Sequence, residues 1–243
     1  MRVRQHRLKV VYRSSKQDIV HIVCHFPDSI EILPGQFFQL LPGENIDLFL
    51  PRPISVMDYH DGRLEFLIRV RGKGTARLAF GEERELIAIG PLGKGFSLPQ
   101  EPKEVILLAG GMGVAPLIFW ERYLIRKDVT YRFFWGLADR NSYDCFPVMP
   151  KRAELFTQDG SAGRKGTVVD VLDELSADVF YVCGPLPMME AVYSRLKEKG
   201  VRAQFCLESR MACGWGGCKG CYIEFAGRSL YVCKEGPVVE VVC

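Results

Sequence analysis

The residues VILLAGGMGVAP, at 105–116, decide the fold that we predict for this chain. The apolar run at 105–109 has the length and composition of a buried parallel strand. Glycines follow it directly, and from Val114 to Arg126 apolar side chains recur at the spacing of a helix with one buried face. A strand, a glycine turn and a helix in this order predict a doubly wound α/β domain.

The alternation of strand and helix continues toward the C-terminus. We expect further strands at 131–137 and 179–183, and a last strand at 201–208 that closes the sheet. Apolar residues also predict helices at 167–175 and from about residue 185. Ligands of such sheets bind at the carboxyl ends of the strands, so the turns at those ends are candidate binding sites.

Two glycine-rich turns follow strands of this predicted sheet. In AGGMGVAP, Gly111 and Gly113 let the backbone approach a diphosphate at the start of a helix. In CGPLPMM, we expect Cys183, Gly184 and Pro185 to form the equivalent turn. The first turn has a proline where the dinucleotide fingerprint has its third glycine, so a tight turn without a ligand also explains it. The pair of turns favours a dinucleotide site.

Residues 1–101 have a different pattern. Short runs of β-branched, aromatic and aliphatic residues alternate with turn sequences such as Pro-Gly and Asp-Gly. A short helix is expected to begin at Thr75. The spacing predicts an antiparallel barrel or sandwich, with strands at 8–12, 19–26, 36–41, 64–70 and 85–90.

Composition and charge exclude several classes of function. The net charge is only +3, without any block rich in lysine and arginine, so nucleic acid is not an expected partner. The longest stretch without charge is too short and too broken by glycine and proline to cross a bilayer. The first residues lack the apolar core of a signal peptide, and we expect a cytoplasmic protein. Its nine cysteines are then ligands or buried thiols in preference to disulfides.

Four cysteines gather near the C-terminus. The segment MACGWGGCKGC places Cys213, Cys218 and Cys221 at C-x4-C-x2-C spacing, and Cys233 follows. This is the spacing of a plant-type 2Fe-2S centre, and its glycines let the loop wrap a flat cluster. A structural zinc site is the alternative, although zinc usually takes two closely spaced pairs. A nicotinamide exchanges a hydride and such a cluster exchanges single electrons, so a flavin is expected between them.

Several segments resemble the ferredoxin reductase superfamily, in which an N-terminal barrel holds a flavin and the next domain binds a nicotinamide nucleotide. RPIS, at 52–55, resembles the flavin motif of that superfamily, and LIRVRGKGT, at 67–75, its second flavin segment. Arg52 also offers a fork of donors for a phosphate, although a barrel strand interrupted by prolines is the plain alternative. The resemblance implies that FAD contacts Arg52, Pro53, Ile54, Ser55, Leu67, Ile68, Arg69, Gly74 and Thr75.

The order of these parts, ending in ESRMACGWGGCKGC at 208–221, resembles the electron transfer subunit of type B dihydroorotate dehydrogenase. The resemblance implies that Cys213, Cys218, Cys221 and Cys233 hold the cluster. It implies that electrons pass from the FMN of a catalytic subunit, through the cluster and FAD, to NAD+ in pyrimidine biosynthesis. It also implies an α2β2 assembly and no catalytic acid or base in this chain. The expected boundaries are 1–101 for the FAD barrel, 102–207 for the NAD domain and 208–243 for the cluster lobe.

Two other functions stay open. A related type of subunit links NAD(P)H to ferredoxin, sulfide or glutamate synthase partners. Asp139 and Arg140, after the second predicted strand, suit a ribose hydroxyl and a 2'-phosphate respectively, so the residues alone do not separate NAD from NADP. A non-catalytic, zinc-bearing interaction module is the third hypothesis, and flavin and iron absorbance in the purified protein would exclude it.

Overall fold

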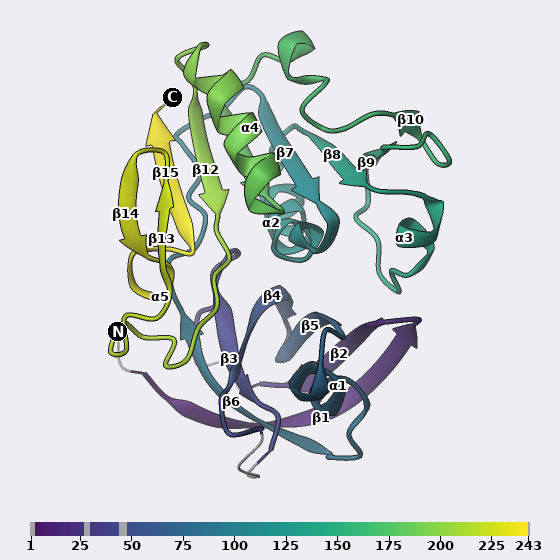
Figure 1. Ribbon diagram of the computed structural model, residues 1–243, viewed down its shortest axis with the longest axis vertical. Coiled ribbons are helices and arrows are strands. Elements are labelled where there is room, and N and C mark those ends of the chain that lie inside the picture. Colours follow the sequence, from purple (N-terminus) through teal and green to yellow (C-terminus); the bar gives the residue numbers. More distant parts are fainter. Residues whose placement is uncertain (1–2, 27–29, 44–47, 243) are drawn as a thin grey trace.

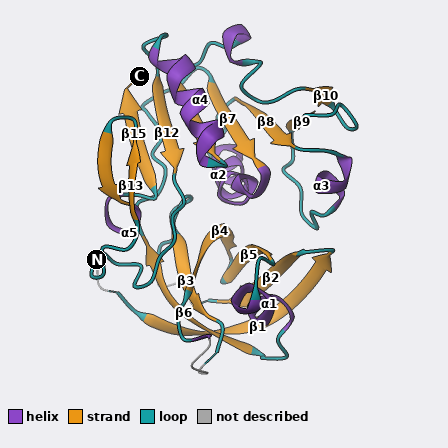
Figure 2. Cartoon of the chain, viewed as in Figure 1, coloured by secondary structure: helices purple, strands orange, loops and turns teal. Residues whose placement is uncertain are grey.

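The computed structural model describes residues 3–26, 30–43 and 48–242. It consists of a closed barrel, a seven-stranded sheet flanked by helices, and a small C-terminal hairpin (Figure 1). The barrel lies below the sheet domain in this view, and the hairpin lies beside the sheet (Figure 2). Within the described ranges, no helix is long and apolar enough to span a membrane.

The barrel is antiparallel and closes in the strand order β1-β2-β5-β4-β3-β6. Its inward side chains, such as Leu8, Ile22, Phe38 and Phe66, are buried together, and Leu78 of helix α1 (Lys73–Phe80) joins them. The predicted antiparallel barrel is therefore confirmed. Its strands are β1 (Gln5–Lys16), β2 (Ile19–His25), β3 (Phe37–Leu41), β4 (Arg52–His60), β5 (Arg63–Arg69) and β6 (Glu85–Leu92).

The sheet of the second domain has the strand order β10-β9-β8-β7-β11-β12-β15. Neighbouring strands run parallel, except that β15 pairs antiparallel with β12 at one edge. The predicted doubly wound α/β domain is confirmed. The strands are β7 (Val105–Gly110), β8 (Tyr131–Leu137), β9 (Ala153–Thr157), β10 (Arg164–Lys165), β11 (Val179–Cys183), β12 (Arg202–Cys206) and β15 (Val238–Val242).

Helices cover both faces of this sheet. Along β7, Ile106 packs in one core with α4 (Leu186–Lys197), whereas Leu107 packs in another with α2 (Val114–Arg126). This is the alternation of side chains that a central strand requires. Because α2 follows β7 through a 3-10 turn at Gly111–Gly113, its N-terminus lies at the carboxyl edge of the sheet.

One predicted helix is wrong. Residues 167–175 form turns with a single 3-10 turn at Leu172–Glu174. The apolar residues at the predicted helical spacing are buried, but their valines have low helix propensity. The Asp170 carboxylate also accepts a hydrogen bond from the backbone N–H of Thr167 at 2.7 Å, which favours a turn there.

Two strand predictions also need correction. The predicted strand at 201–208 does not close the sheet, because β12 ends at Cys206 and β15 forms the edge beyond it. The pattern of parallel strands gives no signal for a late antiparallel strand. In the barrel, β4 is absent from the five predicted strands. The structure places RPIS at its start, as the alternative of a barrel strand at 52–55 implied, and the strand continues to His60.

The C-terminal hairpin packs on the sheet domain. It contains β13 (Tyr222–Phe225) and β14 (Arg228–Tyr231), followed by the short helix α5 (Val232–Glu235). The ring of Phe225 lies 4.9 Å from that of Phe205 in β12 and 5.8 Å from that of Tyr193 in α4. The hairpin therefore shares one apolar core with the sheet.

A buried ionic network joins α2 to the barrel. Arg122 Nη1 contacts Asp58 Oδ2 and lies 3.8 Å from Glu65 Oε2. His60 Nδ1 lies 2.9 Å from Asp58 Oδ2, and His21 Nε2 lies 2.8 Å from Glu65 Oε2. Asp58, His60 and Glu65 have the spacing of metal ligands, but Arg122 supplies the positive charge there. Because Asp58 is only 1% exposed, its charge depends on this guanidinium of the other domain.

The pKa of Glu65 makes this network sensitive to acid. Burial would raise the pKa of this carboxyl, but the hydrogen bond from His21 and the charges of His21, Arg122 and His60 lower it below its usual 4.5. A pKa lowered by folding means that the carboxylate stabilises the fold fully above pH 4.5. This contribution is lost as the pH falls through the lower pKa of the folded state.

We expect Arg122→Met to lower the free energy of unfolding by about 2–3 kcal/mol, because the buried Asp58 carboxylate then keeps only His60 beside it and loses its guanidinium partner. The double variant Arg122→Met/Asp58→Leu should recover most of this loss, since no unpaired charge remains. Urea unfolding at neutral pH measures both. A loss below about 0.5 kcal/mol in the single variant would be that of an exposed ion pair and would contradict the prediction.

Candidate functional site

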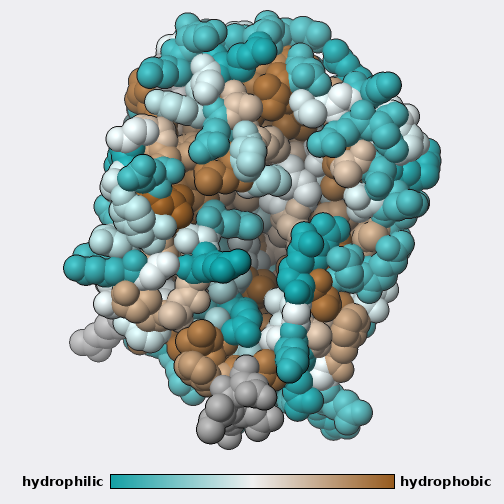
Figure 3. Space-filling view, in the orientation of Figure 1, coloured by the Kyte–Doolittle hydropathy of each residue, from teal (hydrophilic) through white to brown (hydrophobic). Residues whose placement is uncertain are grey.

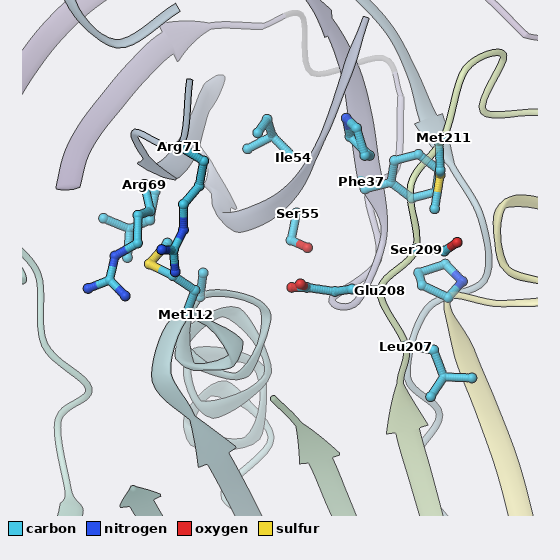
Figure 4. A pocket seen from close by; sticks show the side chains of 14 residues that line it. Phe37, Ile54, Ser55, Arg69, Arg71, Met112, Leu207, Glu208, Ser209 and Met211 are labelled. Carbon is cyan, nitrogen blue, oxygen red and sulfur yellow. The ribbon is translucent and has the colours of Figure 1, made fainter. Parts of the chain in front are cut away.

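A cavity of about 290 Å³ lies between the barrel and the sheet domain. Figure 3 shows the surface hollowed between the two domains on this face. Strands β3, β4 and β5 line one side, and the start of α2 and the loop after β12 line the other (Figure 4). Five of the residues predicted to contact FAD line this flavin cavity, namely Pro53, Ile54, Ser55, Leu67 and Arg69.

Arg52, Gly74 and Thr75 form a second group, at the start of α1. A Cβ on Gly74 would lie 2.4 Å from Arg52 Nη2, so glycine leaves the room that the guanidinium needs. Thr75 Oγ1 accepts hydrogen bonds from the N–H groups of Arg71 and Gly72, at 2.8 and 3.2 Å, and closes the turn. A guanidinium beside a helix N-terminus attracts phosphate, so this group fits the diphosphate of FAD.

Nine further residues line the flavin cavity that the sequence analysis did not assign to it, among them Arg71, Met112 and Glu208. Figure 4 shows Glu208 reaching from the loop after β12 toward Ser55. Burial by the surrounding protein raises the pKa of the Glu208 carboxyl, although its side chain stays open to the cavity. Glu208 begins the cysteine motif and Met112 lies inside the first glycine turn. Both positions in sequence motifs could therefore have marked these residues as members of the site. Ile68 is predicted to contact the flavin through its backbone, and its side chain is buried in the barrel core.

A second cavity, of about 510 Å³, lies at the carboxyl ends of β7, β8 and β11. Gly111 and Pro185 from the two predicted turns line it. Gly136 and Ala138 at the end of β8 line it as well. This is the position at which sheets of this type bind nucleotides, so we name it the dinucleotide cavity.

The other predicted turn residues hold the two turns together beneath this cavity. A Cβ on Gly113 would lie 2.2 Å from Cys183 O, and one on Gly184 would lie 3.0 Å from Gly110 Cα. Cys183 itself is 0% exposed and lines neither cavity. These residues therefore shape the dinucleotide cavity through close backbone packing.

Arg69 connects the two cavities. Of the described residues, it alone lines both, and it is the one charged residue lining the dinucleotide cavity. Its Nε lies 3.2 Å from Asp18 Oδ2 in the barrel, and its guanidinium lies 5.7 Å from the ring centroid of Phe146 in the sheet domain. These contacts hold a positive charge of the barrel at the edge of the other domain.

The four predicted cluster ligands lie together in the C-terminal segment. The sulfurs of Cys221 and Cys233 are 3.2 Å apart. The N–H of Cys218 points to Cys213 Sγ at 3.4 Å, and the N–H of Gly220 points to Cys218 Sγ at 3.4 Å. The loop therefore brings the four thiols into two neighbouring pairs and aims backbone donors at their sulfurs.

The thiols of this loop differ in acidity. Burial would raise the pKa of Cys213, but the backbone N–H groups of Cys218, Trp215 and Gly217 donate to its sulfur and lower its pKa to about 6. Burial, followed by the hydrogen bond with Cys221, raises the pKa of Cys233 to about 12. Backbone donors thus favour the thiolate at Cys213, and a metal cation must displace the proton at Cys233.

The distances between the cysteine sulfurs distinguish a zinc site from a 2Fe-2S site. A zinc ion with four thiolates at about 2.3 Å holds all sulfurs about 3.8 Å apart. In the described part of the chain, no three of these sulfurs lie within 4.8 Å of one another. A 2Fe-2S centre takes its ligands in two pairs on two irons, which fits this arrangement better.

The chain is similar to known proteins along nearly its whole length. Residues 208–242 match the family model described as the iron-sulfur cluster binding domain of dihydroorotate dehydrogenase B. The dihydroorotate dehydrogenase B (NAD(+)) electron transfer subunit of Clostridium acetobutylicum is 34% identical over 96% of this chain and 95% of its own length. The Aquifex aeolicus homolog of that subunit is 35% identical over 92% of this chain and 91% of its own length.

Solved structures share the fold. A structure of the NADH-dependent reduced ferredoxin-NADP oxidoreductase, described with flavin-based electron bifurcation, superposes with a TM-score of 0.83 and 26% identity, over 96% of this chain and 87% of that one. A ferredoxin NADP+ reductase from Neisseria gonorrhoeae, solved with FAD and NADP, has a TM-score of 0.64 and 19% identity, over 81% of this chain and 92% of that one. The second likeness concerns the fold alone.

We expect Gly113→Ala to destabilise the protein by about 3 kcal/mol, because the new Cβ would overlap the backbone of Cys183, which cannot move aside cheaply. Gly111→Ala is the matched control. Its Cβ meets nothing within 4 Å, and only the positive φ of +53° is unfavourable, at about 1 kcal/mol. Thermal unfolding compares the two, and equal losses of stability would contradict the close packing of the turns.

Proposed function

We propose that this chain, which belongs to the family of electron transfer subunits of dihydroorotate dehydrogenase B (NAD(+)), carries electrons between a dihydroorotate-oxidising catalytic subunit and NAD+. One observation carries the proposal: in this single chain the cysteine loop adjoins the flavin cavity, and the flavin cavity adjoins the dinucleotide cavity. Met211 of the cysteine motif lines the flavin cavity, and Arg69 lines both cavities.

The cofactors are FAD and a 2Fe-2S cluster, and NAD is the second substrate. When bound, the flavin exchanges a hydride with the nicotinamide and single electrons with the cluster. The chain supplies binding and position for this exchange. No side chain need remove a proton from dihydroorotate, because that step belongs to the catalytic subunit.

The barrel residues divide the binding of FAD between them. Arg52 and the turn at Gly74 and Thr75 would hold its diphosphate. Pro53, Ile54, Ser55, Leu67 and the backbone of Ile68 would enclose its ring system. Cys213, Cys218, Cys221 and Cys233 would bind the irons of the cluster. The corresponding boundaries are 1–101, 102–207 and 208–243, with β15 of the last segment completing the sheet of the second.

The dinucleotide cavity suits NAD. Gly111 opens the backbone at the start of α2 for the diphosphate, while Gly113, Cys183, Gly184 and Pro185 fix the shape of the turns.

The partner that the family implies is the catalytic subunit of dihydroorotate dehydrogenase. We extend the proposal to an FMN-containing partner in an α2β2 assembly, and to the cytoplasm, where reducing conditions keep the ligand thiols free. A subunit that passes electrons from NAD(P)H to a ferredoxin-type partner is the second candidate, because the ferredoxin-NADP oxidoreductase structure superposes on nearly the whole chain.

Purification from the native host tests this function. We expect a co-purifying subunit with FMN, and reduction of NAD+ when dihydroorotate is added to the complex. Reduction of ferredoxin by NADPH, without any turnover of dihydroorotate, would favour the second candidate.

Cys218→Ser should separate the two halves of the electron path. Loss of one thiolate ligand prevents cluster binding, so reduction of NAD+ by dihydroorotate through the partner should fall below detection. Electron transfer from NADH to a dye at the FAD should persist in part, because Cys218 lies outside both cavities. Equal loss of both activities would argue against separate roles for cluster and flavin.

Arg69→Gln should raise the KM for NADH roughly ten-fold or more, because it removes the one charged side chain that lines the dinucleotide cavity among the residues the structure describes. Arg69 also lines the flavin cavity, so the FAD content is measured in parallel, and we expect most of it to be retained because Arg52 serves the flavin phosphates. Arg69→Lys keeps the charge but loses the fork of donors, so we expect an intermediate value. Steady-state NADH-to-dye kinetics measure both, and an unchanged KM in Arg69→Gln would contradict this assignment.

A further inference from the structure

The outward face of β3 connects the flavin cavity with the cysteine loop. Phe38 and Leu40 of this strand belong to the barrel core, so Phe37 and Gln39 point outward. Phe37 lines the flavin cavity. Gln39, two residues along the same strand, contacts the cysteine loop. One hydrogen-bonded strand of the closed barrel therefore touches both sites.

Gln39 contacts the residues on either side of the first cluster cysteine, Cys213. Its Nε2 donates a hydrogen bond to Ala212 O at 3.4 Å. A Cβ on Gly214 would lie 2.6 Å from Gln39 Cγ, and the φ of +85° at this position also favours glycine. The side chain of one glutamine thus holds Cys213 from both sides.

The demands of the barrel do not explain an amide at this position. Gln39 is 0% exposed, and among the described residues its Oε1 has no hydrogen-bond donor. A buried acceptor without a partner costs about 1–3 kcal/mol, which an apolar side chain of the same size would avoid. The amide therefore points to a role in holding the loop.

The opposite end of the same segment is also fixed. The N–H of Leu207 donates to Pro237 O at 2.8 Å, and Leu207, Glu208 and Met211 line the flavin cavity. Residues 207–214 therefore run from the flavin cavity to the cluster with an anchor at each end. Removing the Gln39 contact frees the cluster end alone.

We propose that Gln39 is a positioning residue that fixes Cys213, and with it the cluster, relative to the flavin cavity. The inference rests on the proposed function, because it concerns the electron exchange between these two groups. Groups that orient a metal ligand without binding the metal commonly change metal affinity or activity by roughly 10–100-fold when they are replaced.

The test uses the isolated subunit with both cofactors bound and NADH as the electron donor. NADH is oxidised to NAD+ and passes two electrons to the flavin as a hydride. One of the two then reduces the cluster, and the other remains on the flavin. Rapid mixing with separate flavin and iron-sulfur absorbance distinguishes the rate of the first step from that of the second.

Gln39→Met keeps the volume of the side chain and removes its donor. We expect flavin reduction at the wild-type rate, cluster reduction slowed roughly ten-fold, and an EPR signal of the reduced cluster that is shifted or heterogeneous. Wild-type rates for both steps, with an unchanged EPR signal, would overturn the proposal. Gln39→Asn, whose shorter amide cannot reach Ala212, should behave in the same way, and it decides the matter if Gln39→Met does not fold.

Gln36→Met is the matched control. Gln36 is buried beside the same strand, where its Nε2 donates to Gly93 O and its Oε1 accepts from Leu33 N, both at 2.9 Å. This variant should lower the melting temperature and leave both rates and the EPR signal unchanged. If it alters the EPR signal as Gln39→Met does, the effect is one of general stability and the proposal fails. A wild-type subunit that NADH cannot reduce would instead contradict the proposed function itself.

Discussion

The packing of helix α2 on the barrel fixes the relation of the two domains, on which the rest of the site depends, because Phe119 is buried in the barrel core and Arg122 pairs with Asp58. Helix α2 begins at the glycine turn of the dinucleotide cavity and carries Arg122 toward its other end. Because a helix is stiff, holding Arg122 on the barrel also holds the turn against the flavin cavity. The burial of Asp58 makes the contact costly to break, so it opposes separation of the two domains.

The cluster lobe is held by a different principle. Cys206 and Val238 pair across β12 and β15, so the segment between them leaves the sheet and returns to the same point. Its root is closed by the hydrogen bond from Leu207 to Pro237, and its hairpin packs on Phe205. This explains how so short a segment keeps a cluster site in place without a ferredoxin fold of its own. The sheet supplies the apolar surface on which the lobe packs, in place of a hydrophobic core of its own.

The features that depend on residues close together in the sequence could be predicted. The features that depend on contacts between residues far apart in the sequence could not. The glycine turns, the cysteine motif and the RPIS segment reveal themselves because close backbone approach and metal binding require particular residues at short intervals. Asp58, Arg122 and Gln39 belong to no local motif. Asp58 and Arg122 lie 64 residues apart in the sequence, and Gln39 lies 173 residues from its partner Ala212. Residues 167–175 show the reverse failure, because turns can bury the same side chains that a helix would bury.

The distribution of charge around the dinucleotide cavity links binding to position. The sheet domain supplies glycines, apolar side chains and uncharged polar residues such as Ser142 and Gln158 to this cavity. In the described part of the chain its one charged lining residue, Arg69, comes from the barrel. A dinucleotide that uses Arg69 for its diphosphate must therefore lie against the domain that carries the flavin. A ligand held by the sheet domain alone would lack this charge and bind more weakly. The contribution of Arg69 to binding is thus obtained only when the dinucleotide lies beside the barrel that carries the flavin.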